Sequence, residues 1–430
     1  MKRLKLIVAA LAVVLTAVAQ NQTSPYSMYG YGILSDRATS MQRQMGGVGY
    51  AMNSGRQINV MNPASYAAID SLTFLFDLGA DVSFLWSKEG SAKERTTGGG
   101  VDYLTMQFPI GKHMGGSVGL LPYSSVGYAF GNKIPHGSMS NQGTGGINQL
   151  YLGWAGEWKG VSLGFNISYD FGNIINDVFS ANQSGGQAKY EHVMEVRDWG
   201  INIGLQYTKH FAKFHKVVAG VTYSPKKTLL GNTWVTAEET NIHTPPDTIG
   251  SMKLRNNYYT PNSVGAGVSY TYEKSYRLMV EADFTWQQWS KAKYSALYAD
   301  LPADYKQGDK VKVDLDEVVS PGMNFFDRTK YAVGAEYIPK LRGNYGERIT
   351  YRLGAYYAND YLNINGNRLR EMGVSCGFGF PTYEGKTMIN LGLEWKKRSA
   401  HPQKLIGENY FNITLGVNFN EVWFWQRKIR

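Results

Sequence analysis

The stretch Tyr410–Phe419 alternates without interruption between apolar and polar residues. Its apolar positions are Phe411, Ile413, Leu415, Val417 and Phe419. A period of two is the pattern of a β-strand with one apolar and one polar face. A tilted strand of about ten residues is long enough to cross the hydrocarbon core of a bilayer. The stretch therefore predicts the closing strand of a transmembrane barrel.

The same alternation recurs along most of the chain before it. The clearest further examples are 72–86, 161–172, 199–208, 264–272, 278–287 and 372–380. Short turns alternate with longer polar stretches, which we expect to be loops at 87–100, 132–145, 176–188, 240–250 and 291–327. Short turns on one side and long loops on the other are typical of outer-membrane barrels. The pattern predicts an all-β fold, a transmembrane antiparallel β-barrel of about 14 strands, an even number, over residues 72–420.

Composition agrees with a membrane barrel better than with its alternatives. The mean hydropathy of −0.32 is too polar for a bundle of membrane helices, whereas a barrel strand exposes only every second residue to lipid. Several of the 10 tryptophans fall near expected strand ends, where barrels carry aromatic girdles. A soluble β-barrel is the alternative, but a lumen ringed by so many strands is too wide for side chains to fill.

The first 19 residues have the features of a secretory signal. Lys2, Arg3 and Lys5 precede an apolar run at 6–18, and Ala17-Val18-Ala19 is a small-residue cleavage site. The apolar run is too short to span a bilayer comfortably as an anchor helix. After cleavage near Ala19, no run of 18 apolar residues remains. We therefore expect the mature chain to cross a bacterial outer membrane with strands only.

Residues 20–71 do not alternate and are rich in Gly, Ser, Asn, Met and Tyr. Gly46, Gly47 and Gly49 allow tight turns, and Pro63 after Asn62 suggests a turn or a helix start. A compact segment before the first strand can fill a barrel lumen, so we expect an N-terminal hatch, or plug. Residues 421–430 follow the last strand as an aromatic and basic periplasmic tail.

Several motifs resemble those of FadL-type outer-membrane transporters of hydrophobic molecules. The chain carries MGGVGYA and then NPASYA, in which Asn62-Pro63-Ala64 resembles the hatch motif of that family. The fragment Thr260–Ser263 before a Gly-x-Gly strand and the stretch Leu278–Trp289 are also similar to family features. The resemblance implies passive uptake of apolar compounds such as long-chain fatty acids. It also implies lateral exit through a wall opening at a kink in the third strand.

The third expected strand, Ser117–Phe130, contains Pro122. Proline cannot donate to the strand ladder and is expected at edges or bulges, yet a closed barrel has no edge. The proline therefore marks either a lateral opening or a plain bulge, and the sequence leaves both open. Pro225 and Pro261 also interrupt long strands, and we expect both to lie above the membrane.

Charged residues on the expected inner faces are the remaining site candidates. They are Asp77, Asp81, Asp170, Glu281, Asp283, Glu336, Arg352 and Glu394. One interpretation is that they anchor the hatch, pairing with Arg43, Arg56 or Asn62. The other is that Arg56 or Arg352 meets a ligand carboxylate, which needs such a partner out of water. The proposed ligand path comprises Arg56, Asn62, Pro63, Pro122 and Arg352.

The sequence favours few other functions. Basic residues are scattered, so nucleic-acid binding is not indicated. No nucleophile and base converge in the pattern, and we expect neither an enzyme nor a cofactor. Asp314, Asp316 and Glu317 suit a Ca²⁺ site or, more simply, a solvated acidic loop. Expected partners are outer-membrane lipid, a hydrophobic small-molecule ligand and an outer-membrane protein. The alternative function is a non-transporting barrel subunit of secretion or barrel-assembly machinery.

Overall fold

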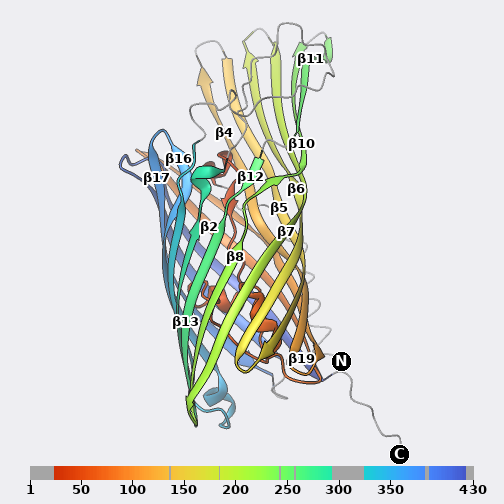
Figure 1. Ribbon diagram of the computed structural model, residues 1–430. Coiled ribbons are helices and arrows are strands. Elements are labelled where there is room, and N and C mark those ends of the chain that lie inside the picture. Colours follow the sequence, from red (N-terminus) through yellow and green to blue (C-terminus); the bar gives the residue numbers. More distant parts are fainter. Residues whose placement is uncertain are drawn as a thin grey trace, which may run out of the picture.

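The computed structural model describes residues 24–134, 137–183, 185–241, 244–255, 258–292, 324–382 and 387–422. Within them, fourteen antiparallel strands form a closed barrel, which we call the wall (Figure 1). The prediction of an all-β barrel of about 14 strands is therefore confirmed. The expected signal, the tail beyond Val422 and the acidic cluster at 314–317 lie outside the described residues.

Each wall strand pairs with its neighbours in chain order, with β8 pairing with β13 and β19 pairing with β2 to close the ring. The strands are β2 (Thr73–Glu89), β3 (Ala92–Gly111), β4 (Met114–Ile134), β5 (Gly137–Trp158), β6 (Val161–Asn182), β7 (Gln187–Ala212), β8 (His215–Ser224), β13 (Ser263–Glu273), β14 (Arg277–Gln287), β15 (Arg328–Ile338), β16 (Thr350–Ile364), β17 (Asn367–Pro381), β18 (Met388–His401) and β19 (Gly407–Val422). The predicted closing strand Tyr410–Phe419 lies in β19, between β18 and β2.

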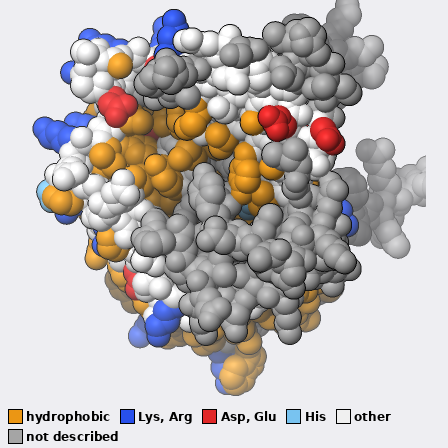
Figure 2. All heavy atoms as spheres, turned by 90° about the horizontal axis from the view of Figure 1, so that it is seen from above, with side chains coloured by type: hydrophobic (Ala, Val, Ile, Leu, Met, Phe, Trp, Pro, Cys, Tyr) orange, Lys and Arg blue, Asp and Glu red, His pale blue; other side chains and the backbone are white. Residues whose placement is uncertain are grey.

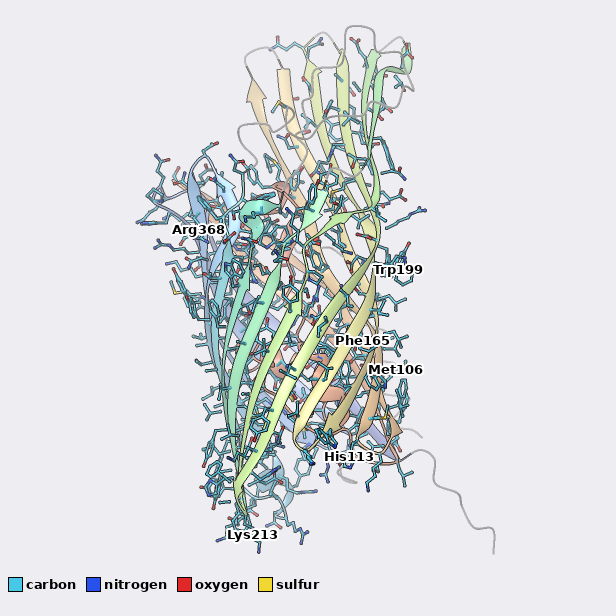
Figure 3. The ribbon with its side chains drawn as sticks, in the orientation of Figure 1. Met106, His113, Phe165, Trp199, Lys213 and Arg368 are labelled. Carbon is cyan, nitrogen blue, oxygen red and sulfur yellow. The ribbon has the colours of Figure 1, made fainter. Side chains whose placement is uncertain are left out.

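Outward side chains of the wall form an apolar belt. In β6, the outward positions Leu163, Phe165 and Ile167 are exposed, whereas Ser162 and Ser168 are buried inside. Figure 3 shows Phe165 and Trp199 on the outer side of the strands. Because no protein covers this belt in the described structure, lipid is the environment that suits it, and the barrel is transmembrane.

The strands run further than the sequence pattern predicts. The expected loops at 87–100, 132–145, 176–188 and 240–250 are wrong, because strands continue through nearly all of these residues. Beyond the membrane both faces of a hairpin meet water, so the alternation vanishes while the backbone ladder continues. The strands β10 (Gly231–Asn241) and β11 (Thr244–Arg255) extend the ladder from β7. Together with β4–β7 they form a sheet that projects from one side of the mouth (Figure 1).

Pro225 and Pro261 end strands rather than interrupt them, which corrects the sequence interpretation. β8 ends at Ser224 and β13 begins at Ser263. Between them a short ribbon of β9 (Lys227–Leu229) and β12 (Tyr258–Thr260) leaves the wall. The ribbon packs its buried side chains into an apolar cluster at the mouth. The prolines therefore mark where the chain departs from the barrel ladder.

Residues 24–71, here called the N-terminal segment, lie within the ring of strands (Figure 1). Its short elements are η1 (Pro25–Met28), β1 (Ile33–Leu34), α2 (Ser40–Arg43) and η2 (Pro63–Ala68). The helix η2 packs on β5, β6 and β7, while α2 packs on β17, β18 and β19. Two further one-turn helices follow later, η3 (Trp289–Lys291) and η4 (Tyr345–Arg348). Among the described helices, none has the length and apolar character needed to cross a membrane.

Candidate functional site

A turn of the N-terminal segment docks on two carboxylates of β14. The amides of Gly49 and Tyr50 donate to Asp283 Oδ2 at 2.7 and 3.1 Å, and the Ala51 amide donates to Glu281 Oε1 at 2.8 Å. Both acidic side chains are buried. Because β14 places residues 281 and 283 on its inner face, two neighbouring carboxylates satisfy three successive backbone donors.

The two glycines before this turn allow its close approach to the wall. Gly46 and Gly47 have φ angles of +71° and +77°, which side-chain-bearing residues rarely adopt. A Cβ on Gly46 would lie 2.9 Å from the backbone of Ala355. These angles, together with the close approach to β16, explain why both positions hold glycine.

Replacing Asp283 with alanine should free the turn without breaking the barrel. The Gly49 and Tyr50 amides would lose their shared acceptor, and a hydrogen bond to a charged group contributes about 1.5–3 kcal/mol. We expect hydrogen exchange of these two amides to accelerate at least about tenfold. Exchange measured by mass spectrometry on peptides covering 46–53 checks this. Unchanged exchange in a folded Asp283→Ala barrel would contradict the docking role.

The Asn62-Pro63 pair forms the start of η2. Asn62 Oδ1 accepts from the Ala64 amide at 3.1 Å, and Pro63 occupies the first helical turn. Asn62 Nδ2 donates to the Tyr50 carbonyl at 2.7 Å. A Cβ on Gly204 of β7 would lie 2.1 Å from Asn62 Oδ1. The pair thus fixes the segment against the wall, and neither residue lines the two cavities described below.

Arg352 of β16 is fully buried and has several partners. Its Nε donates to Glu336 Oε2 at 2.9 Å, and its Nη1 donates to Asn390 Oδ1 at 2.7 Å. Nη1 also donates to Gln44 Oε1 of the N-terminal segment at 2.9 Å. The sequence left open whether Arg352 anchors the segment or meets a ligand carboxylate. Its hydrogen bond to Gln44 is the contact expected for anchoring.

Arg56 lies elsewhere, which corrects its expected position. Its side chain is 78% exposed and pairs with Asp70 of the same segment at 3.3 Å. Neither cavity includes it. The exposure leaves its charge in water, where an ion pair contributes little. Arg43 of the segment does reach the wall, with Nη2 2.7 Å from Asp102 Oδ2.

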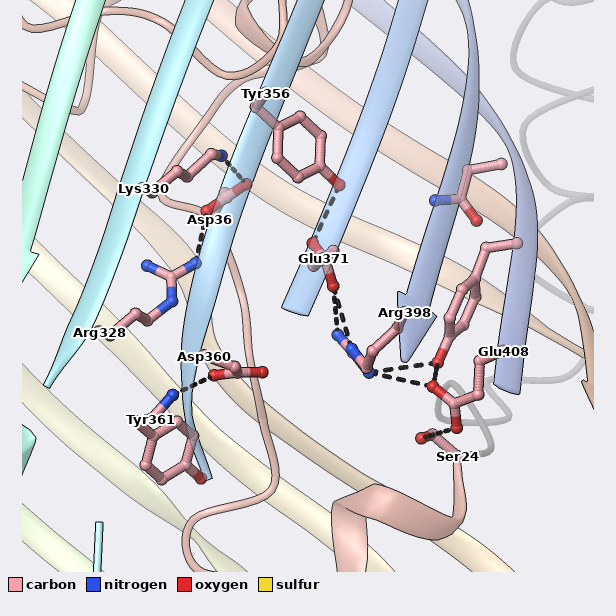
Figure 4. A network of polar contacts seen from close by, with 12 residues as sticks. Ser24, Asp36, Arg328, Lys330, Tyr356, Asp360, Tyr361, Glu371, Arg398 and Glu408 are labelled. Carbon is pink, nitrogen blue, oxygen red and sulfur yellow. Dashed lines mark hydrogen bonds and ion pairs between the residues drawn. The ribbon is translucent and has the colours of Figure 1, made fainter. Parts of the chain in front are cut away.

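Two further groups of polar contacts, which include ion pairs, join the segment to β15, β17, β18 and β19 (Figure 4). In the first, Asp36 lies 2.5 Å from Lys330 Nζ and 3.6 Å from Arg328 Nη2. In the second, Arg398 pairs with Glu371 at 2.6 Å and with Glu408 at 3.4 Å. Ser24 Oγ donates to Glu408 at 2.6 Å. The sequence analysis missed both groups, because nothing in the local pattern of these residues indicates a partner so far away.

An apolar cluster lies at the mouth where the projecting sheet begins. Tyr31 of the N-terminal segment packs against Trp289, with ring centroids 5.3 Å apart, and Trp289 packs against Tyr361 at 4.5 Å. Phe325 and Tyr258 complete the group, and all five side chains are buried. Figure 2 shows apolar side chains gathered on the described part of this face. We call these residues the aromatic cap.

The ladder between β3 and β4 is incomplete. The two strands pair from Gly111↔Met114 only as far as Leu104↔Leu120. Beyond that point, β4 keeps β5 as its neighbour, with a register shift between Pro122 and Ser124. The β1 residues Ile33 and Leu34 pair with Ser125 and Ser124 instead of β3. Pro122 therefore lies at a bulge, and the wall beside it has a break that we call the β3/β4 gap.

A cavity of about 540 Å³ lies at the β3/β4 gap. Its lining includes Gly99–Asp102 of β3 and Pro122 of β4, the one predicted ligand-path residue found in either cavity. Charged side chains of both signs also line it, from the segment and from six wall strands. These are Asp36, Arg43, Asp81, Asp102, Arg328, Asp360, Glu371, Glu394, Lys396 and Arg398.

Solved structures share this architecture. The Ralstonia pickettii toluene transporter TbuX covers 89% of this chain and 98% of its own, with 15% identity and a TM-score of 0.58. A Pseudomonas aeruginosa FadL homologue covers 90% and 99%, with 10% identity and a TM-score of 0.59. The Pseudomonas putida toluene transporter TodX covers 91% and 100%, with 14% identity and a TM-score of 0.57. The resemblance to FadL-type barrels is therefore confirmed for the fold.

Fold and interior together define a transmembrane β-barrel of the FadL type whose N-terminal residues lie inside it. At the sequence level, the model of the BamG family matches residues 1–430. The chain belongs to the BamG family. No curated protein sequence matches it.

Proposed function

We propose that this chain is an outer-membrane barrel that passes small hydrophobic or amphiphilic molecules sideways into the membrane through the β3/β4 gap. The observation that carries this proposal is the ladder that stops at Leu104↔Leu120 beside a cavity of about 540 Å³. A closed barrel satisfies its backbone groups within the wall, so a break at membrane depth needs another partner. Here Ile33 and Leu34 of the N-terminal segment supply part of it.

The N-terminal segment acts in this proposal as a hatch, and the short β1 pairing is its movable part. Two paired residues are a small ladder compared with the full-length pairing of the neighbouring strands. The rest of the segment is held by the ion pair of Asp36 with Lys330, by the hydrogen bond of Ser24 to Glu408 and by the turn on Asp283. Release of Ile33 and Leu34 alone would widen the β3/β4 gap while the hatch stays in place.

The paired charges of the cavity favour a solute without net charge, whether hydrophobic or amphiphilic, over a fatty-acid anion. In the cavity, Arg43 already pairs with Asp102, and Arg398 already pairs with Glu371. A ligand carboxylate would compete with these carboxylates for the same guanidinium groups. Toluene transporters and a monoaromatic hydrocarbon channel are among the structurally similar proteins, which supports a compact apolar solute.

Flux through purified protein in liposomes with an outer leaflet of lipopolysaccharide tests the proposal, because a bilayer of phospholipid alone is already permeable to toluene. Three radiolabelled probes are compared, namely toluene, palmitate and glucose. We expect a rise of about tenfold or more over empty liposomes for toluene, a smaller rise for palmitate and none for glucose, because the passage leads into the bilayer and not into a water-filled pore. Equal flux of all probes would indicate an open pore. No flux of any probe would overturn the transport proposal.

A second candidate function is that of a barrel subunit in a larger outer-membrane assembly. The projecting sheet favours it, because above Gly127 the strand β4 is in register with β5 alone, and β11 is in register with β10 alone, among the described residues. Sheet edges of this kind accept a strand from another chain. Purification in mild detergent distinguishes the candidates. A stoichiometric protein partner that is lost when 231–255 are replaced by a short Gly-Ser turn supports the assembly role.

A further inference from the structure

The wall has a second break, on the far side of the projecting sheet from β4. The strand β7 pairs with β8 from Ala212↔His215 to Ile203↔Tyr223, and it pairs with β10 from Val196↔Gly231 onward. Residues 198–202 lie between these two ladders and have no strand partner on that side within the described residues. The cause is local, since the chain leaves the wall at Pro225 and enters the ribbon of β9 and β12. We call this break the β7/β8 gap.

A cavity of about 470 Å³ lies at the β7/β8 gap. Its lining includes the inward side chains Ser168, Asp170 and Thr222, which are buried. It also includes Ile167, Trp199 and Ile201, whose side chains face outward and are 44%, 64% and 44% exposed. Consecutive residues of β6 and β7, with inward and outward side chains alike, line this one cavity, which places it directly against the unpaired part of β7.

Lys227 lies across the β7/β8 gap. It is the first residue of β9, and its Nζ lies 3.0 Å from Asp198 Oδ2 and 3.4 Å from Asp170 Oδ2. The same ammonium donates to the carbonyl of Trp199, in the unpaired part of β7. One side chain thus takes the place of the missing strand, since it donates to a wall carbonyl and forms ion pairs with two inner carboxylates.

We propose that the β7/β8 gap is a second lateral opening, which takes up the acyl chain of a lipid-like amphiphile from the membrane and which Lys227 keeps closed. This inference rests on the proposed function for its purpose, because a barrel that releases molecules sideways needs a route by which they arrive. Whether an acyl chain binds in the cavity does not depend on transport, and it is tested separately.

The surroundings of the gap indicate an acyl chain. Trp199 packs on Tyr169 with ring centroids 5.1 Å apart, and Tyr223 lies exposed on β8 opposite Ile203, where the pairing of β7 with β8 ends. Exposed Trp and Tyr mark the interface between headgroups and chains in membrane proteins. Apolar atoms of Leu121, Val60 and Met61 continue the lining inward. A volume of about 470 Å³ falls within the range of about 300–1,000 Å³ that small-molecule sites occupy.

The two cavities meet at the same piece of the N-terminal segment. Leu34, Ser35, Asp36 and Gly47 line both of them, and so does Arg328 of β15. This stretch continues from β1, which pairs with β4 at the β3/β4 gap. An acyl chain that fills the cavity at the β7/β8 gap therefore contacts residues that close the β3/β4 gap. This contact connects uptake at one gap with release at the other.

Photo-crosslinking of the full-length protein in nanodiscs tests the second opening. The probes are palmitate with a mid-chain diazirine and a phosphatidylcholine carrying the same acyl group, and adducts are located by mass spectrometry. We expect adducts on the inward residues Ser168, Asn202 and Thr222, increased about tenfold by Lys227→Ala, because that variant removes the ammonium that closes the gap. The phosphatidylcholine arm reports a membrane lipid and the palmitate arm a free amphiphile, and inward adducts from either support the proposal.

Matched variants make the result specific. Lys226→Ala is the control, since Lys226 donates to the Lys291 carbonyl and lies over the Tyr259 ring, away from the gap. It should leave labelling unchanged, as should Lys227→Arg, which keeps the charge. Asn202→Trp should abolish inward adducts by filling the cavity. Each variant is checked for a folded barrel by its heat-dependent electrophoretic mobility.

The outcomes separate this inference from the proposed transport function. Adducts confined to outward side chains such as Trp199 and Trp158, with no change in Lys227→Ala, would overturn the second opening. Inward adducts that persist when flux is absent would leave the second opening supported and the transport proposal overturned. Flux without inward adducts would leave the transport proposal supported and the second opening overturned.

Discussion

Replacing Arg352 with alanine should reduce the stability of the barrel more than any other single change considered for this protein. The side chain is buried and donates to Glu336, Asn390 and Gln44. Removing it leaves the Glu336 carboxylate in the lumen without its nearest cation, and breaking a buried pair in this way costs about 3–5 kcal/mol. Thermal unfolding in detergent, followed by the shift in electrophoretic mobility, measures the loss.

Arg56→Ala is the matched control for this prediction. Arg56 is exposed and its one ion pair, to Asp70, lies in water. Such a pair contributes about 0–1 kcal/mol, so the control should unfold at nearly the temperature of the native protein. Equal unfolding temperatures for Arg352→Ala and Arg56→Ala would mean that Arg352 does not anchor the N-terminal segment.

A disulfide between β1 and β4 should abolish flux through the β3/β4 gap. Leu34 and Ser124 are directly opposite in the ladder, and opposed residues of antiparallel strands lie about 4.5–5.5 Å apart at Cα. That spacing is within the range a disulfide spans. In a Cys376→Ser background, Leu34→Cys with Ser124→Cys would hold β1 in the gap. We expect toluene flux to fall by about tenfold or more when oxidised and to return on reduction.

The control disulfide lies in an unbroken part of the wall. Ala282 and Val333 are opposed residues on the outer face of β14 and β15. Cysteines at these two positions should oxidise without affecting flux. If the Leu34–Ser124 disulfide also leaves flux unchanged, then release of β1 is not part of the passage, and the assembly role becomes the better account.

The sequence predicted the parts of the structure that depend on local periodicity. Alternation assigned inner and outer faces correctly, so buried Asp283 and Glu336 were expected inside the barrel. Strand lengths were underestimated, because alternation disappears where a hairpin such as 87–100 leaves the membrane and is wetted on both faces. Periodicity reports the environment of a strand, whereas its length is set by backbone pairing.

Pairing between distant residues could not be predicted. Arg56 and Arg352 were equal candidates in the sequence, and only the fold shows one exposed and the other buried among acceptors. Pro122 was identified from its missing amide, which is a local property. The β7/β8 gap was not, since it depends on the register at which β7 exchanges β8 for β10. Pro225 indicated an interruption there, but not which neighbouring strand would lose its partner.

The hydrogen bond between Ser24 and Glu408 spans 384 positions of the chain. Ser24 is therefore translated long before Glu408, and the hydrogen bond of Arg352 to Gln44 joins residues 308 positions apart. Contacts so remote in sequence form late and make folding slow. The N-terminal segment is therefore translated early but forms its native contacts late. Until β19 closes the barrel, its polar groups have to be shielded or solvated.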